Sequence, residues 1–105
     1  MRDEPLNRGY TMPVMHFLVR WPDGVEANCY SPSTVVGKYF AAGESYSVGD
    51  FVARSREALN IGSERVRVKY GFACSAALDQ LARIEEDASR FSEAHDARVT
   101  VLALD

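Results

Sequence analysis

The sequence predicts an α+β fold, and three observations support this prediction. Apolar and polar residues alternate near both ends of the chain, which is the spacing of strands that bury one face. Between these segments, apolar residues recur every three or four positions, as they do in amphipathic helices. The strands are thus grouped at the ends instead of alternating with helices. We expect the order β-β-α-α-α-β, with a three-stranded, largely antiparallel sheet and the helices packed on one of its faces.

The length of 105 residues leaves room for one small domain. The first twelve residues are polar and contain a turn signal around Gly9. We therefore expect a flexible N-terminal arm over residues 1–12 and a single α+β domain over residues 13–105.

Two short strands are expected first, over residues 14–21 and 25–30. The Pro22-Asp23-Gly24 segment between them has turn chemistry, because proline presets its φ angle and glycine accepts a positive one. The two strands should form an antiparallel hairpin. One face of the first strand is apolar and is expected to enter the core: Met15, Phe17, Val19 and Trp21.

A short helix should follow the hairpin. Ser31 can accept hydrogen bonds from free backbone N–H groups, and Pro32 suits the first helical position, where no donor is needed. We expect this helix to end near Phe40.

The longest predicted helix covers residues 48–70. Its apolar stripe is interrupted by Gly62, which marks either a kink or a close helix crossing. Lys69 places a cation in the last turn, and Gly71 suits the left-handed position that ends many helices.

The last helix is expected over residues 74–93, and a β-branched strand over residues 99–104. The helix has the most regular amphipathic pattern in the chain. Its apolar positions are Cys74, Leu78, Leu81, Ile84, Ala88 and Phe91.

Charge and hydropathy exclude several classes of protein. The net charge of −3 makes a nucleic-acid binder an unfavoured interpretation. No apolar run approaches the roughly 20 residues that a membrane span needs. Residues 1–5 carry acidic side chains and no apolar stretch, so they do not resemble a secretory signal. We expect a cytoplasmic protein that neither spans nor binds a membrane.

The two cysteines allow two interpretations. Cys29 and Cys74 form no CxxC motif, and with no export signal we expect both thiols to be reduced. A cysteine at a helix N-terminus, as expected for Cys74, can have a lowered pKa and act as a nucleophile, with His16 as a partner. Alternatively, both cysteines are small buried apolar residues.

No metal or cofactor site is expected. The sequence contains no phosphate-binding glycine loop and no dinucleotide fingerprint. His16, His95 and the two cysteines are not spaced as metal ligands on one helix. The consecutive carboxylates of residues 85–87 have the pattern of a solvated helix face.

Charge is distributed unevenly between the two long helices. Residues 50–70 hold five basic and three acidic residues, a net charge of +2. Residues 79–96 hold two basic and six acidic residues, a net charge of −4. Either the two helices are neighbours that attract each other, or Arg54, Arg56 and Arg65 form a basic stripe that meets an acidic protein or a nucleotide phosphate.

Five segments together resemble a known family. They are FLVRWPDG at 17–24, CYSPS at 29–33, SREAL at 55–59, SERVRVKYGFACS at 63–75 and ALDQL at 77–81. They are similar to the small bacterial nitrogen-starvation-response proteins, which are encoded in gene clusters with a nitrilase and a radical-SAM enzyme. The similarity covers residues 13–104.

The resemblance implies a role in nitrile or cyanide nitrogen use, and we interpret the protein as a non-catalytic accessory or binding protein. Its partner would be an enzyme of that gene cluster or a small metabolite, and a homodimer through an uncovered sheet face is compatible with this. The alternative is a thiol-dependent enzyme or redox switch that uses Cys74, with or without Cys29. The polar and aromatic residues of the shared segments are candidates for the binding surface: Arg20, Trp21, Tyr30, Arg56, Glu64, Arg65, Lys69, Tyr70 and Cys74.

Overall fold

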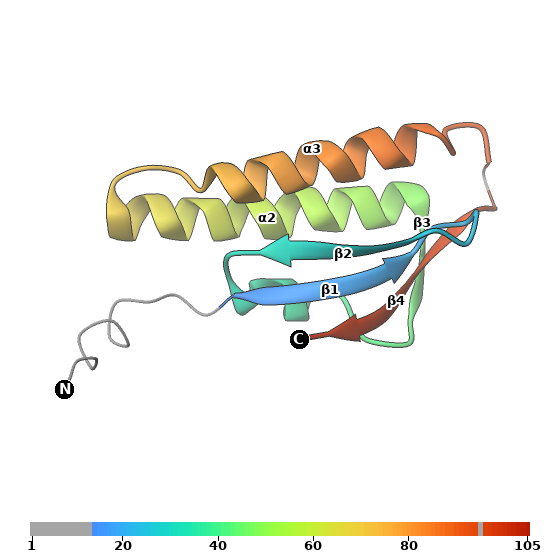
Figure 1. The fold of residues 1–105 in the computed structure, drawn as a ribbon, viewed down its shortest axis with the longest axis horizontal. Coiled ribbons are helices and arrows are strands. Elements are labelled where there is room, and N and C mark those ends of the chain that lie inside the picture. The colour runs from blue at the N-terminus through green and yellow to red at the C-terminus, as the bar shows by residue number, and fades with distance from the viewer. Residues whose placement is uncertain (1–13, 95) are drawn as a thin grey trace.

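The structure, a computed structural model, describes residues 14–94 and 96–105 and has an α+β fold (Figure 1). One antiparallel sheet has the strand order β2-β1-β4-β3. The predicted arm over residues 1–12 and His95 lie outside the described residues. The strands are β1 (Met15–Arg20), β2 (Glu26–Ser31), β3 (Ser45–Ser47) and β4 (Arg98–Leu104).

Two long helices lie side by side above one face of the sheet (Figure 1). They are α2 (Val48–Tyr70) and α3 (Ser75–Ser89), and a short 3₁₀ helix, η1 (Thr34–Lys38), packs against α2. The end at which α2 and α3 are joined extends beyond the strands (Figure 1). The helix pair therefore has one end over the sheet and one end that projects from it.

The α+β class is confirmed, but the predicted three strands and three helices are wrong. The described residues form four strands and two α-helices. The additional strand, β3, has three residues, too few to show alternation in the sequence. It is held by pairing with β4, and the hydroxyls of Ser45 and Thr100 are hydrogen-bonded at 3.0 Å.

The predicted helix before Phe40 is the 3₁₀ helix η1. Its cap is Ser33, whose hydroxyl accepts from the backbone N–H of Val35 at 3.2 Å. Ser31, the predicted cap, instead donates its hydroxyl to the carbonyl of Ser33 at 2.7 Å. Two β-branched valines and Gly37 give this segment a low helix propensity, which explains why it stops after five residues.

The predicted hairpin of the first two strands is confirmed. The carbonyl of Trp21 accepts from the N–H of Gly24 at 2.9 Å, and Gly24 has a φ of 89°. The N–H of Trp21 donates to the carbonyl of Val25 at 2.8 Å and closes the turn.

Helix α2 has the bounds predicted from the sequence. The hydroxyl of Ser47 accepts from the N–H of Asp50 at 3.2 Å and caps its start. Gly71 ends the helix with a φ of 87° and donates its N–H to the carbonyl of Arg67 at 2.8 Å. Helix α3 is shorter than predicted and ends at Ser89, because the chain then turns toward β4.

The core lies between the sheet and the helices and is rich in aromatic rings. Trp21 lies against Phe51, with ring centroids 5.4 Å apart, and stacks on Phe91 at 6.0 Å. The predicted apolar face of β1 is buried at Phe17, Val19 and Trp21. On α3, Leu78 is exposed and Ala77 is buried in its place, which corrects the predicted stripe.

Gly62 lies where α2 crosses the segment before η1. A Cβ atom added at Gly62 would lie 3.1 Å from Cγ of Pro32, which is closer than most such contacts. Of the two predicted roles for this glycine, the structure therefore shows the close approach.

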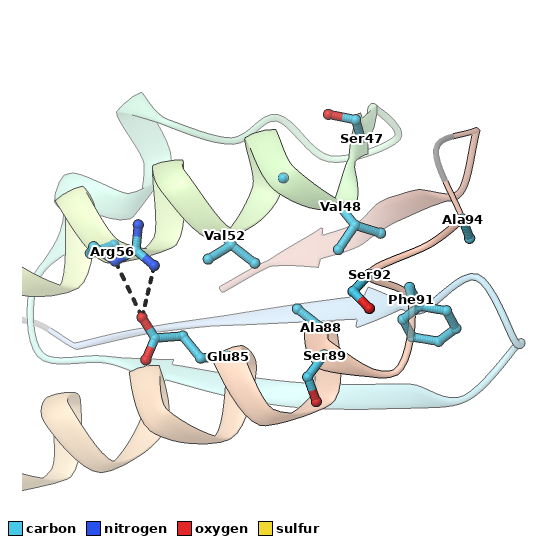
Figure 2. Close-up of a pocket in the computed structure, with 11 residues that line it drawn as sticks. Ser47, Val48, Val52, Arg56, Glu85, Ala88, Ser89, Phe91, Ser92 and Ala94 are labelled. Atoms are coloured by element: carbon cyan, nitrogen blue, oxygen red, sulfur yellow. Dashed lines mark hydrogen bonds and ion pairs between the residues drawn. The ribbon is translucent and has the colours of Figure 1, made fainter.

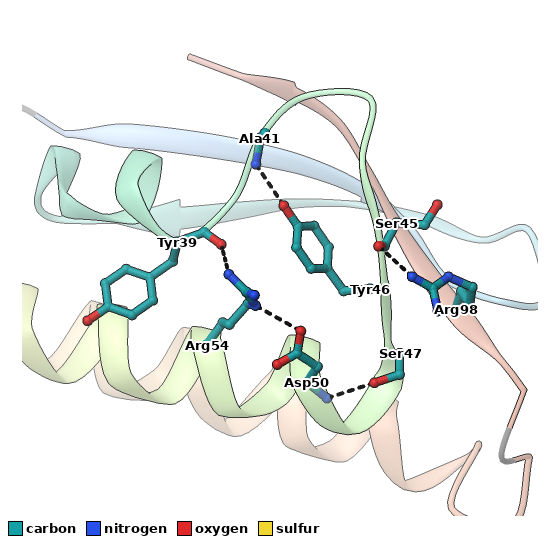
Figure 3. Close-up of polar contacts among 8 residues, drawn as sticks. All are labelled: Tyr39, Ala41, Ser45, Tyr46, Ser47, Asp50, Arg54 and Arg98. Atoms are coloured by element: carbon teal, nitrogen blue, oxygen red, sulfur yellow. Dashed lines mark hydrogen bonds and ion pairs between the residues drawn. The ribbon is translucent and has the colours of Figure 1, made fainter.

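Arg54 connects α2 to the segment that leads into β3 (Figure 3). Its Nε donates to Asp50 at 2.8 Å, and its Nη1 donates to the carbonyl of Tyr39 at 2.7 Å. The guanidinium also lies over the ring of Tyr46, 4.9 Å from the centroid, and the Tyr46 hydroxyl accepts from the N–H of Ala41. Arg54 thus has a structural role and is not part of an open basic stripe.

Candidate functional site

A groove separates α2 and α3 at the end of the helix pair that lies over the sheet (Figure 2). We call it the interhelix groove, and its volume is about 650 Å³. Helix α2 supplies Val48, Val52 and Arg56, which are spaced four residues apart and so share one helix face. The opposite wall of the groove is formed by residues of α3 and of the turn that follows it: Glu85, Ala88, Ser89, Phe91, Ser92 and Ala94.

One wall of the groove is supported by the aromatic core. Phe91 lines the groove and stacks on Trp21 with an interplanar angle of 9°. The guanidinium of Arg90 lies 5.1 Å from the centroid of the Phe91 ring. The position of Phe91 is therefore fixed by contacts on the side of the core and on the side of the solvent.

An ion pair between the helices lies at one end of the groove (Figure 2). The Nε and Nη2 atoms of Arg56 donate to the same carboxylate oxygen of Glu85, at 3.2 and 2.9 Å. This pair supports the interpretation that the basic and acidic helices are neighbours that attract each other. Arg67 and Arg83 instead pair with carboxylates of their own helix.

The joined end of the two helices carries a second candidate surface. Val68 and Phe72 are 73% and 67% exposed, and the ring of Phe72 lies 6.5 Å from that of Tyr70. Lys69 stands between these apolar residues in the sequence. We call Val68, Lys69, Tyr70 and Phe72 the hairpin tip.

Tyr30 and Cys74 meet beside the hairpin tip. Cys74 is the residue before α3 and is half-buried, and its side chain lies beside that of Tyr30. Partial burial and this contact with Cys74 raise the pKa of Tyr30. The ring of His16 also lies near that of Tyr30, with ring centroids 5.9 Å apart. The predicted thiol and its predicted histidine partner are thus linked through a tyrosine.

Cys29 has a different environment. It is 1% exposed in the core, and burial, assisted by the charge of Asp87, raises its pKa to about 12. The thiolate is therefore strongly disfavoured near neutral pH, and the Cys29 thiol is a poor nucleophile.

The other predicted surface residues are dispersed. Arg20 pairs with Glu26 at 3.0 Å on the β1–β2 hairpin. Trp21 is buried, and its Nε1–H has no acceptor among the residues that the structure describes. Arg65 donates to the hydroxyl of Ser33 at 3.0 Å and braces η1.

Glu64 pairs with Arg67 one turn along α2, and together with Arg65 it lines a second hollow on that helix. Of the nine predicted residues, the structure therefore brings together Glu64 and Arg65, and also Tyr30 and Cys74, with Lys69 and Tyr70 nearby in the chain. It places Arg56 in the interhelix groove.

Two functional candidates were not found by sequence reasoning. Glu85 was interpreted as part of a solvated face, because its pairing depends on how the two helices are aligned. Val68 and Phe72 have a detectable signal in the sequence, since Val68 is an apolar residue outside the stripe of α2 and Phe72 is an apolar residue in the turn that follows this helix.

Two further properties concern the described parts of the chain. Within residues 14–94 and 96–105, no helix combines the length and the apolar character that crossing a bilayer requires. In the same residues, no cluster of three or more His, Cys, Asp or Glu side chains is arranged to hold a metal ion.

Fold and surface together define a small α+β protein, in which a helical hairpin covers a four-stranded antiparallel sheet and offers surfaces suited to binding. The chain belongs to the family described as nitrogen starvation-induced protein NitG, whose model matches residues 16–104. This confirms the predicted resemblance to the nitrogen-starvation proteins. No curated protein and no solved structure matches the chain.

Proposed function

We propose that this nitrogen starvation-induced protein is a non-catalytic accessory protein that binds an enzyme of a nitrilase-containing gene cluster through its hairpin tip. The observation that carries the proposal is the exposure of Val68 and Phe72 on the projecting end of the helix pair. Exposed apolar and aromatic side chains that lie close together are typical of protein interaction surfaces.

The charge around the tip indicates what the partner offers. Residues 65–78 contain three basic residues and no acidic one. Of the three, Arg65 and Arg67 bind Ser33 and Glu64, which leaves Lys69 as the cation beside the apolar residues. We therefore expect a partner with an apolar pocket for Phe72 and an acidic rim.

The alternative function, a thiol-dependent enzyme or redox switch, depends on one of the two cysteines. Burial makes Cys29 unreactive near neutral pH, so an exchange between the two cysteines is not favoured. Cys74 remains the candidate for a thiol function, because it is half-buried and contacts Tyr30.

A pull-down from nitrogen-starved cells of the source bacterium tests the proposal. The bait is the tagged protein, and the recovered proteins are identified and quantified by mass spectrometry. We expect a nitrilase or a radical-SAM enzyme in stoichiometric amount. The double variant Val68→Ser, Phe72→Ser should lose that partner, while Val25→Ser, which changes an exposed valine at the distant β1–β2 turn, should retain it.

Three outcomes distinguish the hypotheses. Equal recovery of the enzyme with the double variant would remove the hairpin tip from the proposal. Recovery of no cluster enzyme with the unaltered bait would reject the accessory role. If the Cys74→Ser bait alone loses the partner, the thiol alternative is supported instead.

A further inference from the structure

We propose that the interhelix groove binds a small monocarboxylate, whose head group pairs with Arg56 and whose apolar body lies along Val52 and Phe91. This site is distinct from the hairpin tip and does not depend on the proposed protein partner. The shape of the groove, the unused edge of one guanidinium and the balance of charge support this site.

The groove has the size and the lining of a small-molecule site. Its volume of about 650 Å³ lies within the range of about 300–1,000 Å³ that is typical of pockets for small-molecule ligands. Val48, Val52, Ala88 and Phe91 give part of it an apolar surface, three serines and Glu85 line the rest, and Arg56 is the one basic group among the described lining residues. Such a pocket favours a ligand with an apolar body and a single polar head.

Glu85 holds Arg56 in position through one edge of the guanidinium, and the other edge remains available. Nε and Nη2 both donate to one oxygen of Glu85, which fixes the plane of the guanidinium. The opposite edge, made by Nη1 and the second N–H of Nη2, meets no acceptor among residues 14–94 and 96–105. Two parallel N–H groups in a fork match the two oxygens of a carboxylate.

The other arginines on α2 do not present an open pair of N–H groups in the interhelix groove. Arg54 uses Nη1 to bind the carbonyl of Tyr39, and Arg65 uses Nη1 to bind Ser33. Arg67 is committed to Glu64 on the exposed side of the helix. The combination of a braced guanidinium and an apolar wall is therefore specific to Arg56 in the described helix.

The charge of the site favours one negative charge over two. Glu85 already neutralises part of the charge of Arg56, so a ligand carboxylate would share the guanidinium with a second carboxylate. A dianionic head such as a phosphonate would be repelled more strongly by Glu85. A neutral amide would lose the charge-assisted hydrogen bonds.

An NMR titration of the ¹⁵N-labelled protein tests the site with three probes that share one apolar body: phenylacetate, phenylacetamide and benzylphosphonate. Phenylacetate should give saturable shifts at Val52, Ala88, Ser92 and the Nε–H of Arg56. The amide and the phosphonate should each bind about tenfold more weakly, which is the effect of losing about 1.4 kcal/mol.

Variants separate the guanidinium from general charge. Arg56→Gln should weaken phenylacetate binding about tenfold, and Arg56→Lys should weaken it too, because a lysine offers no fork. Arg83→Gln is the matched control, since Arg83 pairs with Asp79 on the exposed face of α3 at 2.7 Å and does not line the groove. Its affinity for phenylacetate should be unchanged.

Four results would overturn the proposal. They are the absence of saturable shifts with phenylacetate, equal affinity for phenylacetamide, unchanged affinity in Arg56→Gln, and shifts confined to residues outside the groove. None of them bears on the hairpin tip, so this proposal and the accessory role can fail separately.

Discussion

The two ends of the helix pair use apolar residues in opposite ways. Over the sheet, Phe51 and Phe91 pack around Trp21 and hold α2 and α3 to the strands. At the projecting end, Val68 and Phe72 face solvent, and the helix is maintained by local features such as the Gly71 cap. Hydrophobicity alone therefore does not identify the core, and the exposed side chains of the tip are available for binding because they are not packed in it.

The largest expected effect on stability comes from removing a buried ring, and it can be compared directly with the removal of an exposed ring. Phe51→Ala should lower the free energy of unfolding by about 3–5 kcal/mol, because it removes a fully buried ring and leaves a cavity. Phe72→Ala should change it by less than about 0.5 kcal/mol, because the ring is already in water. Urea denaturation followed by circular dichroism measures both values.

A large loss of stability in Phe72→Ala would show that the hairpin tip is part of the packed fold. In that case the tip could not be assigned to binding on the basis of its exposure.

The second prediction extends the comparison to the two cysteines. Because the pKa of Cys29 rises from 9.0 to about 12 on folding, the folded state keeps this proton at pH values where the unfolded chain loses it. The stabilisation is complete below pH 9 and is lost as the pH rises toward 12. The slope is about 1.4 kcal/mol per pH unit, or about 2 kcal/mol between pH 9 and 10.5.

Denaturation of the native protein and of Cys29→Ala over this pH range measures the effect. The variant should lack this part of the decrease in unfolding free energy at alkaline pH, whatever its stability at neutral pH. Identical slopes in the two proteins would mean that Cys29 titrates in the folded state as it does in the unfolded chain.

The third prediction compares two glycines of α2. Gly62→Ala should destabilise the protein by about 1 kcal/mol, because the new methyl group approaches Pro32 and outweighs the gain in helix propensity. Gly49→Ala meets no atom within 4 Å and should stabilise it by about 0.5 kcal/mol. Thermal unfolding of both variants measures the difference in stability. Equal stabilisation by Gly62→Ala and Gly49→Ala would show that the segment around Pro32 moves aside at little cost.

The smallest effect is expected at the interhelix groove. Arg56 and Glu85 are 51% and 42% exposed, so Arg56→Gln should cost between about 0.2 and 1 kcal/mol of stability. Urea denaturation at low and high salt should show that most of this cost disappears at high salt. A larger, salt-independent loss would indicate that Arg56 acts in folding and would weaken its use as a binding group.

The parts of the fold that could be predicted from the sequence are those with local physical causes. Helix α2 has a capping serine, an apolar stripe and a glycine at its end, and its bounds were predicted correctly. The β1–β2 hairpin has its own turn chemistry. Strand β3 was missed because its three residues are held by β4, more than 50 positions away in the sequence.

In the candidate sites too, residues close in the sequence could be predicted, whereas residues that only the fold brings together could not. Lys69, Tyr70 and Cys74 could be proposed from the sequence as candidates because they lie close together in one segment. The Arg56–Glu85 pair joins residues 29 positions apart, and only the antiparallel alignment of α2 and α3 brings them into contact. Phe91 packs against the core, as its place in the apolar stripe predicts, and in the structure it also lines the groove.

The strand order has a consequence for how the chain folds during its synthesis. The inner strand β4 pairs with both β1 and β3, and the pair Val19–Val101 joins positions 82 residues apart. In a nascent chain the β1–β2 hairpin is therefore synthesised long before β4, the strand that unites the sheet, and both helices also precede β4. Because closing so long a loop costs chain entropy, we expect a slow folding step and an interval in which β1 exposes an unpaired edge. During that interval, we expect the edge to be open to chaperones and to other nascent copies.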